Sequence, residues 1–170
     1  MNKKLAQEIL QMVREDQTMR RGAYRLGEWD IDLDRKHTEQ LKMIIRKHDW
    51  PTIPLVGKKA SWGAWLLAQH ADHDMNFQKK CLNLLKKAYK DNPKSVGKAN
   101  IAYLMDRILV NEDKKQLFGT QFSLNRKGKF VPRPIQRIKE LNQRRKEYGL
   151  DSFEKYLKAA KKYRPSLKKQ

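Results

Sequence analysis

Residues 62–89 read WGAWLLAQHADHDMNFQKKCLNLLKKAY and carry the strongest helical pattern in the chain. Apolar side chains recur along this stretch at intervals close to 3.6 residues: Trp62, Leu66, Phe77, Cys81, Leu84 and Ala88. Such a stripe is typical of an amphipathic helix that buries one face. We expect Ser61 to cap this helix and Asp91-Asn92-Pro93 to end it, so the segment predicts a mainly α fold.

The same period predicts shorter helices on both sides of this stretch. Five such helices are expected. The first covers about 3–20, and the second begins after an Asp34 N-cap and ends before Trp50-Pro51. The others cover about 98–110, the segment from Pro134 to Gly149, and the segment that begins at Asp151 or Ser152. Residues 52–59, which contain two glycine or proline breakers, are expected to form a loop. The chain therefore reads as about six helices in all.

Between residues 116 and 131 the pattern changes to one that is typical of strands. Apolar residues flank Asn125-Arg126-Lys127-Gly128, so a small β-hairpin with a four-residue turn is predicted near 116–131. We interpret residues 1–163 as a single helical domain, a bundle of about six helices with this one hairpin. A basic tail is expected over 164–170.

Length and composition exclude several classes of protein. With 170 residues, the chain is long enough for one ordinary domain. Its apolar runs are far shorter than the roughly 20 residues that a membrane-spanning helix needs. The single cysteine, Cys81, excludes an intramolecular disulfide framework. Because no apolar run follows the basic first residues, we expect no signal peptide and a cytoplasmic protein.

The formal net charge is +20, and the basic excess is largest near the C-terminus. Residues 131–170 contain 13 basic and 4 acidic side chains. Such a surface attracts polyanions through counterion release. One hypothesis is therefore a non-catalytic nucleic-acid-binding protein that uses this region as a basic face, with Arg144, Arg145 and Lys146 on the phosphates. The alternative is that the lysines only keep the helix surfaces solvated.

Two histidines interrupt the apolar stripe of residues 62–89. On a continuous helix His70 and His73 point into the stripe, and Gln69 and Asp74 lie at its borders. Because buried polar groups need partners, this arrangement predicts either a hydrogen-bond network or a wet cleft. Three interpretations stay open: a divalent metal site formed by His70, His73 and Asp74, acid/base chemistry at His70, or a purely structural network.

Three more polar groups lie within or beside apolar segments. Asp106-Arg107 falls in the helix over 98–110, where Asp106 is a candidate base, metal ligand or ion-pair partner. Gly119-Thr120-Gln121 interrupts the first strand of the hairpin, which indicates either close approach of a ligand or of another chain segment, or a β-bulge. Asp16-Gln17 and Arg20 lie near the end of the first helix.

These residues form a pattern that resembles a bacterial family described as a domain of unknown function. The shared pieces include Asp16-Gln17 with Arg20 and Asp106-Arg107. The most specific pieces are Gln69-His70-Ala71-Asp72 and Gly119-Thr120-Gln121. The resemblance covers roughly residues 5–157. It implies no established activity, but the recurring polar residues of the family fall at the positions singled out above, which favours a site. The high lysine content and the basic tail depart from the pattern of the family.

The leading hypothesis is a small enzyme, a hydrolase or transferase that acts on an anionic substrate such as a nucleotide or another phosphate compound. His70, Asp106 and Asp16 would form its catalytic group, with a divalent metal as the candidate cofactor. The substrate would be held by Gln69, Arg107, Thr120, Gln121 and Arg20. The alternatives are the nucleic-acid-binding protein described above and a protein-interaction module of the immunity type. The oligomeric state stays open.

Overall fold

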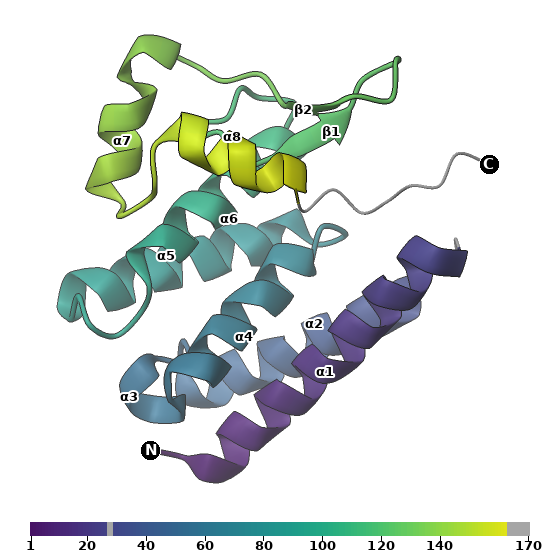
Figure 1. Ribbon diagram of the computed structural model, residues 1–170. Helices are drawn as coiled ribbons and strands as arrows, with labels where there is room; N and C mark the ends of the chain where they lie inside the picture. Colours follow the sequence, from purple (N-terminus) through teal and green to yellow (C-terminus); the bar gives the residue numbers. More distant parts are fainter. Residues whose placement is uncertain (27–28, 163–170) are drawn as a thin grey trace. The chain divides into compact units, whose positions relative to one another are not determined.

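The computed structural model describes residues 1–26 and 29–162, and its contacts divide the chain into two compact units (Figure 1). Unit 1 spans Met1–Ile101, and unit 2 begins at Ala102. The described residues form eight α-helices, one 3-10 helix and a two-stranded antiparallel sheet. The mainly α fold with a small hairpin is therefore confirmed, and the expected count of about six helices is slightly too low. The predicted tail lies outside the described residues, and the single domain stays a prediction.

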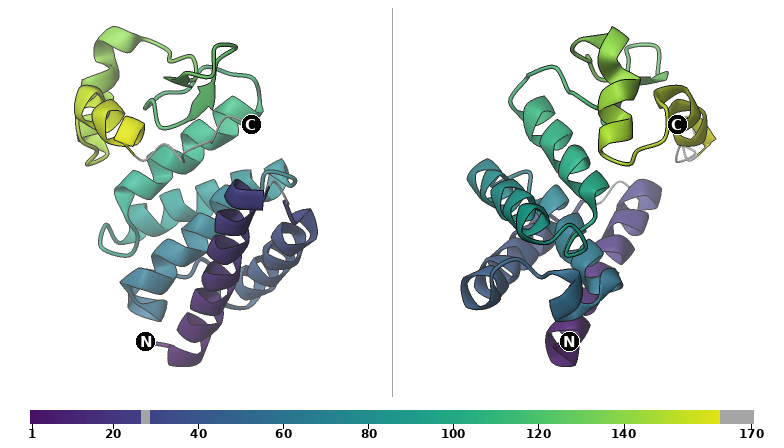
Figure 2. Two further views of the ribbon diagram at one scale, coloured as in Figure 1. Left: turned by 45° about the vertical axis from the view of Figure 1, so that its right-hand side comes forward. Right: turned by 90° about the vertical axis from the view of Figure 1, so that its left-hand side faces the viewer.

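Unit 1 contains five complete helices: α1 (Lys3–Leu26), α2 (Ile31–His48), α3 (Ile53–Val56), α4 (Lys58–His70) and α5 (Met75–Asp91). α4 contacts each of the other four, and its central place among them can be followed in Figures 1 and 2. The core between these helices is mostly apolar, with Ile9, Leu41 and Ala64 fully buried. α4 is therefore the element against which the rest of unit 1 is positioned.

The close approach of α1 to α4 depends on Gly63. A Cβ atom at this position would lie 2.8 Å from Cγ2 of Val13 and 3.3 Å from Cγ2 of Ile9. Glycine therefore lets the side chains of α1 rest directly on the backbone of α4. This contact fixes the position of α1 beside the helix that ends at His70.

The largest departure from the sequence prediction is a break within residues 62–89. α4 ends at His70 and α5 begins at Met75, so the predicted continuous helix is wrong. Asp74 explains the new start, because its side chain accepts a hydrogen bond of 2.9 Å from the backbone N–H of Phe77 and caps α5. The backbone of an N-cap residue is not helical, so the helix that ends at His70 cannot continue through Asp74.

Gln78 stabilises this break from the side of α5. Its Nε2 donates to the carbonyl oxygens of Ala68 and Gln69, at 3.3 and 3.2 Å, and to Asp72 Oδ1 at 3.1 Å. The carbonyl groups in the last turn of a helix have no partner within the helix, so a buried amide donor there replaces the missing bonds. Gln78 is fully buried, and it thereby fixes the end of α4 at His70.

Two predicted helix starts are also wrong. α2 is capped by Asp30, whose carboxylate accepts a backbone hydrogen bond of 2.9 Å, and Asp34 lies buried within the helix. α4 starts at Lys58, so Ser61 lies within the helix and not at its N-cap. The predicted loop over 52–59 contains α3 and the start of α4. Pro54 lies in the first turn of α3, where proline is tolerated, and Gly57 lies between α3 and α4, so neither breaker excludes a helix here.

Unit 2 contains the rest of α6 (Lys98–Asn111), β1 (Phe122–Leu124), β2 (Phe130–Pro132), the 3-10 helix (Ile138–Glu140), α7 (Leu141–Glu147) and α8 (Phe153–Lys162). In the hairpin Leu124 pairs with Phe130, so the loop spans 125–129, one residue more than predicted. The helix expected from Pro134 starts later, at the 3-10 turn, because the chain there forms an isolated bridge to Gln116. Gly149 has a φ of 68° after α7, as predicted.

Candidate functional site

Four polar side chains from three helices of unit 1 form one hydrogen-bonded group, here called the Asp16 cluster. It consists of Asp16 and Arg20 on α1, Asp34 on α2 and His70 at the end of α4. Arg20 Nε lies 2.8 Å from Asp16 Oδ1, and Arg20 Nη2 lies 2.6 Å from Asp34 Oδ1. His70 Nδ1 lies 2.9 Å from Asp16 Oδ1. The structure thus brings together three residues that the sequence singled out, and it adds Asp34.

Asp16 lies at the centre of the cluster and is 1% exposed. Its carboxylate accepts hydrogen bonds from Gln17 Nε2 at 2.7 Å, from Arg20 and from His70. Burial raises the pKa of this carboxyl group, but the hydrogen bonds and charges of His70, Gln17 and Arg20 outweigh burial and lower the pKa of Asp16 to about 2. Asp16 is therefore ionised at neutral pH although it is buried.

Asp34 shares Arg20 with Asp16 but has a different environment. Burial raises the pKa of Asp34, and the charge of Arg20 opposes this rise only in part. The pKa values of the two carboxyl groups are therefore driven in opposite directions, as in sites where two carboxyl groups have different tasks. Arg20 also lies over the ring of Trp29, 4.6 Å from its centroid. These contacts give Arg20 a structural part in holding the cluster.

His70 is the member of the Asp16 cluster that reaches the surface. Its side chain is 20% exposed, and the nitrogen that faces Asp16 is Nδ1. An ionised carboxylate can only accept hydrogen bonds, so Nδ1 must be the donor in this contact. In the neutral imidazole the proton therefore lies on Nδ1 and the lone pair lies on Nε2. Within the described part of the chain, no residue is hydrogen-bonded to Nε2. This nitrogen is therefore placed to take up a proton from a molecule that approaches from outside.

The predicted metal group of His70, His73 and Asp74 is not formed. The break at residues 71–74 removes the continuous helix on which the spacing depended, and His73 is exposed on the turn. Asp74 caps α5 and pairs with Lys42 Nζ at 2.7 Å. In residues 1–26 and 29–162, no group of three or more His, Cys, Asp or Glu side chains is arranged to hold a metal ion.

Asp106, the other predicted catalytic carboxylate, is held by hydrogen bonds within unit 2. It is fully buried and accepts from the backbone N–H groups of Leu117, Phe118 and Thr120 and from the Thr120 hydroxyl, at 2.7–3.1 Å. Burial raises the pKa of Asp106, and these hydrogen bonds oppose the rise. Because both carboxylate oxygens are saturated by the loop that follows α6, the contacts indicate a structural role.

Arg107, Thr120 and Gln121, which were expected to bind the substrate, line one open pocket of unit 2 with a volume of about 440 Å³. Arg107 Nη1 donates to Gln121 Oε1 at 3.2 Å, and Gln121 Nε2 donates to Thr120 Oγ1 at 3.1 Å. The other walls include three aromatic rings, those of Phe122, Phe130 and Tyr156. The polar side chains of this pocket therefore hold one another in place.

Sequence reasoning missed the roles of Asp34 and Gln116. Fully buried Gln116 donates from Nε2 to the carbonyl oxygens of Gln121 and Arg133, and it accepts from the Gln121 N–H. In an extended segment Gln116 shares a face with Phe118, so alternation could have indicated its burial. Asp34 precedes the core residue Leu41 by two helical turns, and this spacing was the signal for an inward-facing carboxylate.

Gln69 lies beside His70 on α4 and was expected to hold the substrate. Its side chain is 8% exposed, and its Oε1 has no hydrogen-bond partner among the described residues. A buried amide oxygen of this kind can accept a hydrogen bond from a ligand or from water. Its position next to His70 keeps Gln69 a candidate for substrate binding.

The arginines of the predicted basic face are used inside unit 2. Arg145 is 1% exposed, donates to the backbone carbonyl oxygens of Phe118 and Asp151, and lies 4.8 Å from the centroid of the Tyr156 ring. Arg144 is 12% exposed and donates to three backbone carbonyl oxygens. Lys146 is exposed. The expectation that all three residues face phosphates is therefore corrected, because two of the three are committed to the fold.

Fold and site together define a mainly helical protein in which a buried group of two carboxylates and an arginine holds one partly exposed histidine. The chain belongs to the Family of unknown function (DUF6624), whose model matches residues 3–165. No curated protein and no solved structure gives a match. The resemblance to a family of unknown function is thereby confirmed. Among the described helices, none combines the length and the apolar character that crossing a membrane requires.

Proposed function

We propose that the chain is an acid–base enzyme, a hydrolase or transferase, in which His70 acts first as general base and then as general acid. The observation that carries this proposal is the 2.9 Å contact between His70 Nδ1 and the buried carboxylate of Asp16. With a pKa of about 2, Asp16 keeps its charge, orients the imidazole ring and stabilises the imidazolium that forms during the reaction. The partly exposed ring then offers Nε2 to the substrate.

In the proposed reaction Nε2 removes a proton from a water molecule or a substrate hydroxyl. That oxygen forms a bond to the electrophilic centre of the substrate, and the bond between this centre and the leaving group breaks. The imidazolium charge is balanced by Asp16. The proton on Nε2 then passes to the leaving group, so His70 returns to its neutral form. Arg20 and Asp34 are positioning residues in this account, because Arg20 bridges both carboxylates and so holds Asp16 against His70.

We propose an anionic substrate that contains phosphate, such as a nucleotide. The net charge of +20 supports this choice, because it raises the local concentration of anions. Lysine side chains would supply the attraction, since the guanidinium of Arg20 is already bonded to two carboxylates. Nucleic-acid binding and an immunity-type interaction stay predictions, and no contact among the described residues favours either of them.

His70→Ala tests the proposed function, and His73→Ala is its matched control, because His73 is an exposed histidine three positions away that the mechanism does not use. The wild-type chain is assayed against a panel of nucleotides and phosphate esters, and the variants against the substrate that is turned over. We expect His70→Ala to lower kcat about 10²–10⁴-fold and His73→Ala to leave it unchanged. Equal turnover by the wild type and His70→Ala would remove His70 from the mechanism.

A further inference from the structure

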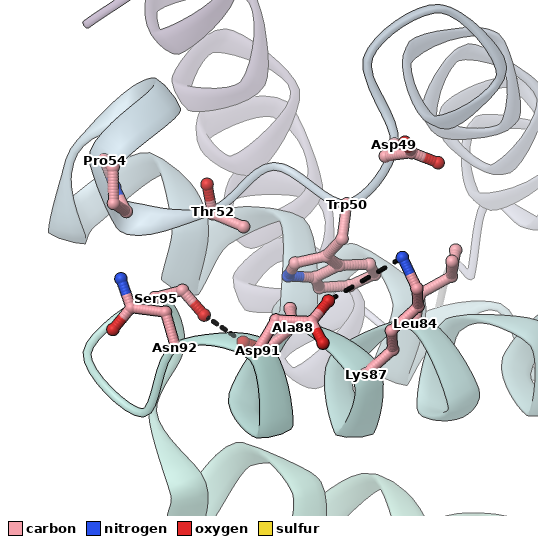
Figure 3. Close-up of a pocket in the computed structure, with 10 residues that line it drawn as sticks. All are labelled: Asp49, Trp50, Thr52, Pro54, Leu84, Lys87, Ala88, Asp91, Asn92 and Ser95. Atoms are coloured by element: carbon pink, nitrogen blue, oxygen red, sulfur yellow. Dashed lines mark hydrogen bonds and ion pairs between the residues drawn. The ribbon is translucent and has the colours of Figure 1, made fainter.

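A polar pocket lies in unit 1 between the segment that follows α2 and the C-terminal half of α5 (Figure 3). Its volume is about 300 Å³. Trp50, Thr52 and Pro54 line one side, and Asn92 and Ser95 lie on the other. No member of the Asp16 cluster lines this pocket, so what it binds is independent of the proposed function.

Trp50 indicates that this pocket is formed for a ligand. Its side chain is 3% exposed, and its indole Nε1 has no hydrogen-bond partner in the described part of the structure. A buried donor without a partner costs about 1–3 kcal/mol, and such groups are rare in folded proteins. In Figure 3 the indole nitrogen faces the gap between Thr52 and Ser95. An acceptor bound in this gap would supply the missing partner.

Three more groups at the gap are available to a ligand. Thr52 occupies the N-cap position of α3, but its hydroxyl makes no capping hydrogen bond. Asn92 uses its Oδ1 for the Lys94 N–H at 2.9 Å, and no described residue accepts from its amide NH₂ group. The Ser95 hydroxyl donates to the Ala88 carbonyl oxygen at 2.6 Å, which leaves its oxygen as an acceptor. The gap therefore presents donors and acceptors side by side.

The charges at the rim argue against a charged ligand. Lys87 and Asp91 form an ion pair of 3.7 Å at the pocket, and Asp49 adds a second carboxylate. An anion would be repelled by these carboxylates, and an ammonium group would leave the Trp50 N–H without an acceptor. A hydroxyl group can both donate and accept, so a neutral ligand with several hydroxyl groups satisfies the whole set.

We propose that this pocket binds a neutral polyhydroxyl compound of about the size of a monosaccharide, with one ligand hydroxyl accepting from Trp50 Nε1. The apolar surfaces of Pro54 and Leu84, which also line the pocket, fit the C–H faces of a sugar ring. The volume of about 300 Å³ lies at the small end for ligand pockets, which favours a single ring over a longer chain.

Indole ¹H–¹⁵N signals of the full chain report directly on this site. The chain has four tryptophans, and Trp50→Phe assigns the Trp50 signal by its loss. D-Glucose, D-galactose and D-mannose are titrated at millimolar concentrations, with sodium acetate as the charged comparison. We expect at least one sugar to shift the Trp50 signal to saturation, while the signal of Trp62, which is 46% exposed, stays in place.

Thr52→Val tests the site without touching the core, because it replaces a half-buried hydroxyl by a methyl group of similar shape. We expect it to weaken sugar binding about tenfold, as for the loss of one hydrogen bond. Thr18→Val on α1 is the control and should bind as the wild type does. Three results would each overturn the proposal: no saturable shift with any of the sugars, an equal shift with acetate, or unchanged affinity in Thr52→Val.

Discussion

Asp16 holds a full negative charge inside the protein, and the resulting stability depends on pH. In an unfolded chain its carboxyl group has a pKa near 4, whereas the folded pKa is about 2. Because the folded state favours the ionised form, the stabilisation is complete above pH 4 and is lost as the pH falls through 2. Asp34 changes the pH dependence of stability in the opposite sense. Burial raises its pKa, so the folded state favours the protonated form of this carboxyl group.

We expect the wild type to lose roughly 2 kcal/mol more unfolding free energy between pH 4 and pH 2 than Asp16→Asn, because the amide does not titrate. Urea unfolding followed by circular dichroism at each pH measures this difference. Asp30→Asn, which changes the exposed cap of α2, is the control and should follow the wild-type pH dependence. Parallel curves for the wild type and Asp16→Asn would show that Asp16 is not the acid-sensitive group.

The sequence could place Asp16 beside Arg20, because residues four positions apart share a helix face. It could not identify the carboxylate that holds His70. Asp16, Asp74 and Asp106 were all available, and the choice depends on how α1 packs against α4. That packing follows from contacts such as the one between Gly63 and Val13, which no local pattern in the sequence encodes.

At the scale of elements, periodicity found the apolar faces of α4 and α5 but missed the break between them. Apolar positions such as Phe77 and Cys81 continue the stripe, so a helical wheel treats both helices as one. The break is decided by the cap that Asp74 provides and by the hydrogen bonds of Gln78, which compete with helical continuation. His73 therefore lies on an exposed turn, and the metal site inferred from the wheel does not form.

Gly63→Ala should separate α1 from α4. The new Cβ atom would lie 2.8 Å from Val13 Cγ2, so we expect a loss of about 1–3 kcal/mol in unfolding free energy, measured by urea denaturation. Gly22→Ala on α1 is the matched control. Nothing lies within 4 Å of its Cβ position, so higher helix propensity should stabilise it by about 0.5–1 kcal/mol. Stabilisation of both variants would contradict the close contact.

Arg145→Gln should destabilise unit 2 by about 2–4 kcal/mol. The backbone carbonyl oxygens that accept hydrogen bonds from Arg145 would lose a charged, buried donor. Lys146→Gln removes the same charge from the exposed neighbouring position and should change stability by less than about 0.5 kcal/mol. Chemical unfolding of both variants provides the comparison. If Arg145→Gln were as stable as Lys146→Gln, the arginine would be free for a role at the surface.

For the whole molecule, the net charge did not indicate which basic side chains are available at the surface to bind a ligand. Arg20, Arg144 and Arg145 are bonded to carboxylates or to backbone carbonyl oxygens, and the sequence could not separate them from exposed lysines. The mainly helical fold was predictable because it depends on the composition of the chain and on the spacing of its apolar residues. The division into two compact units was not, because it depends on which helices pack together.

In the proposed mechanism Asp16 acts on the reaction only through His70. The kcat values of the wild type, Asp16→Asn, His70→Ala and the double variant test this on the substrate that the wild type turns over. We expect Asp16→Asn to lower kcat strongly in the wild-type background and to change it little in the His70→Ala background. An equal loss in both backgrounds would contradict the account, because Asp16 would then act without the histidine.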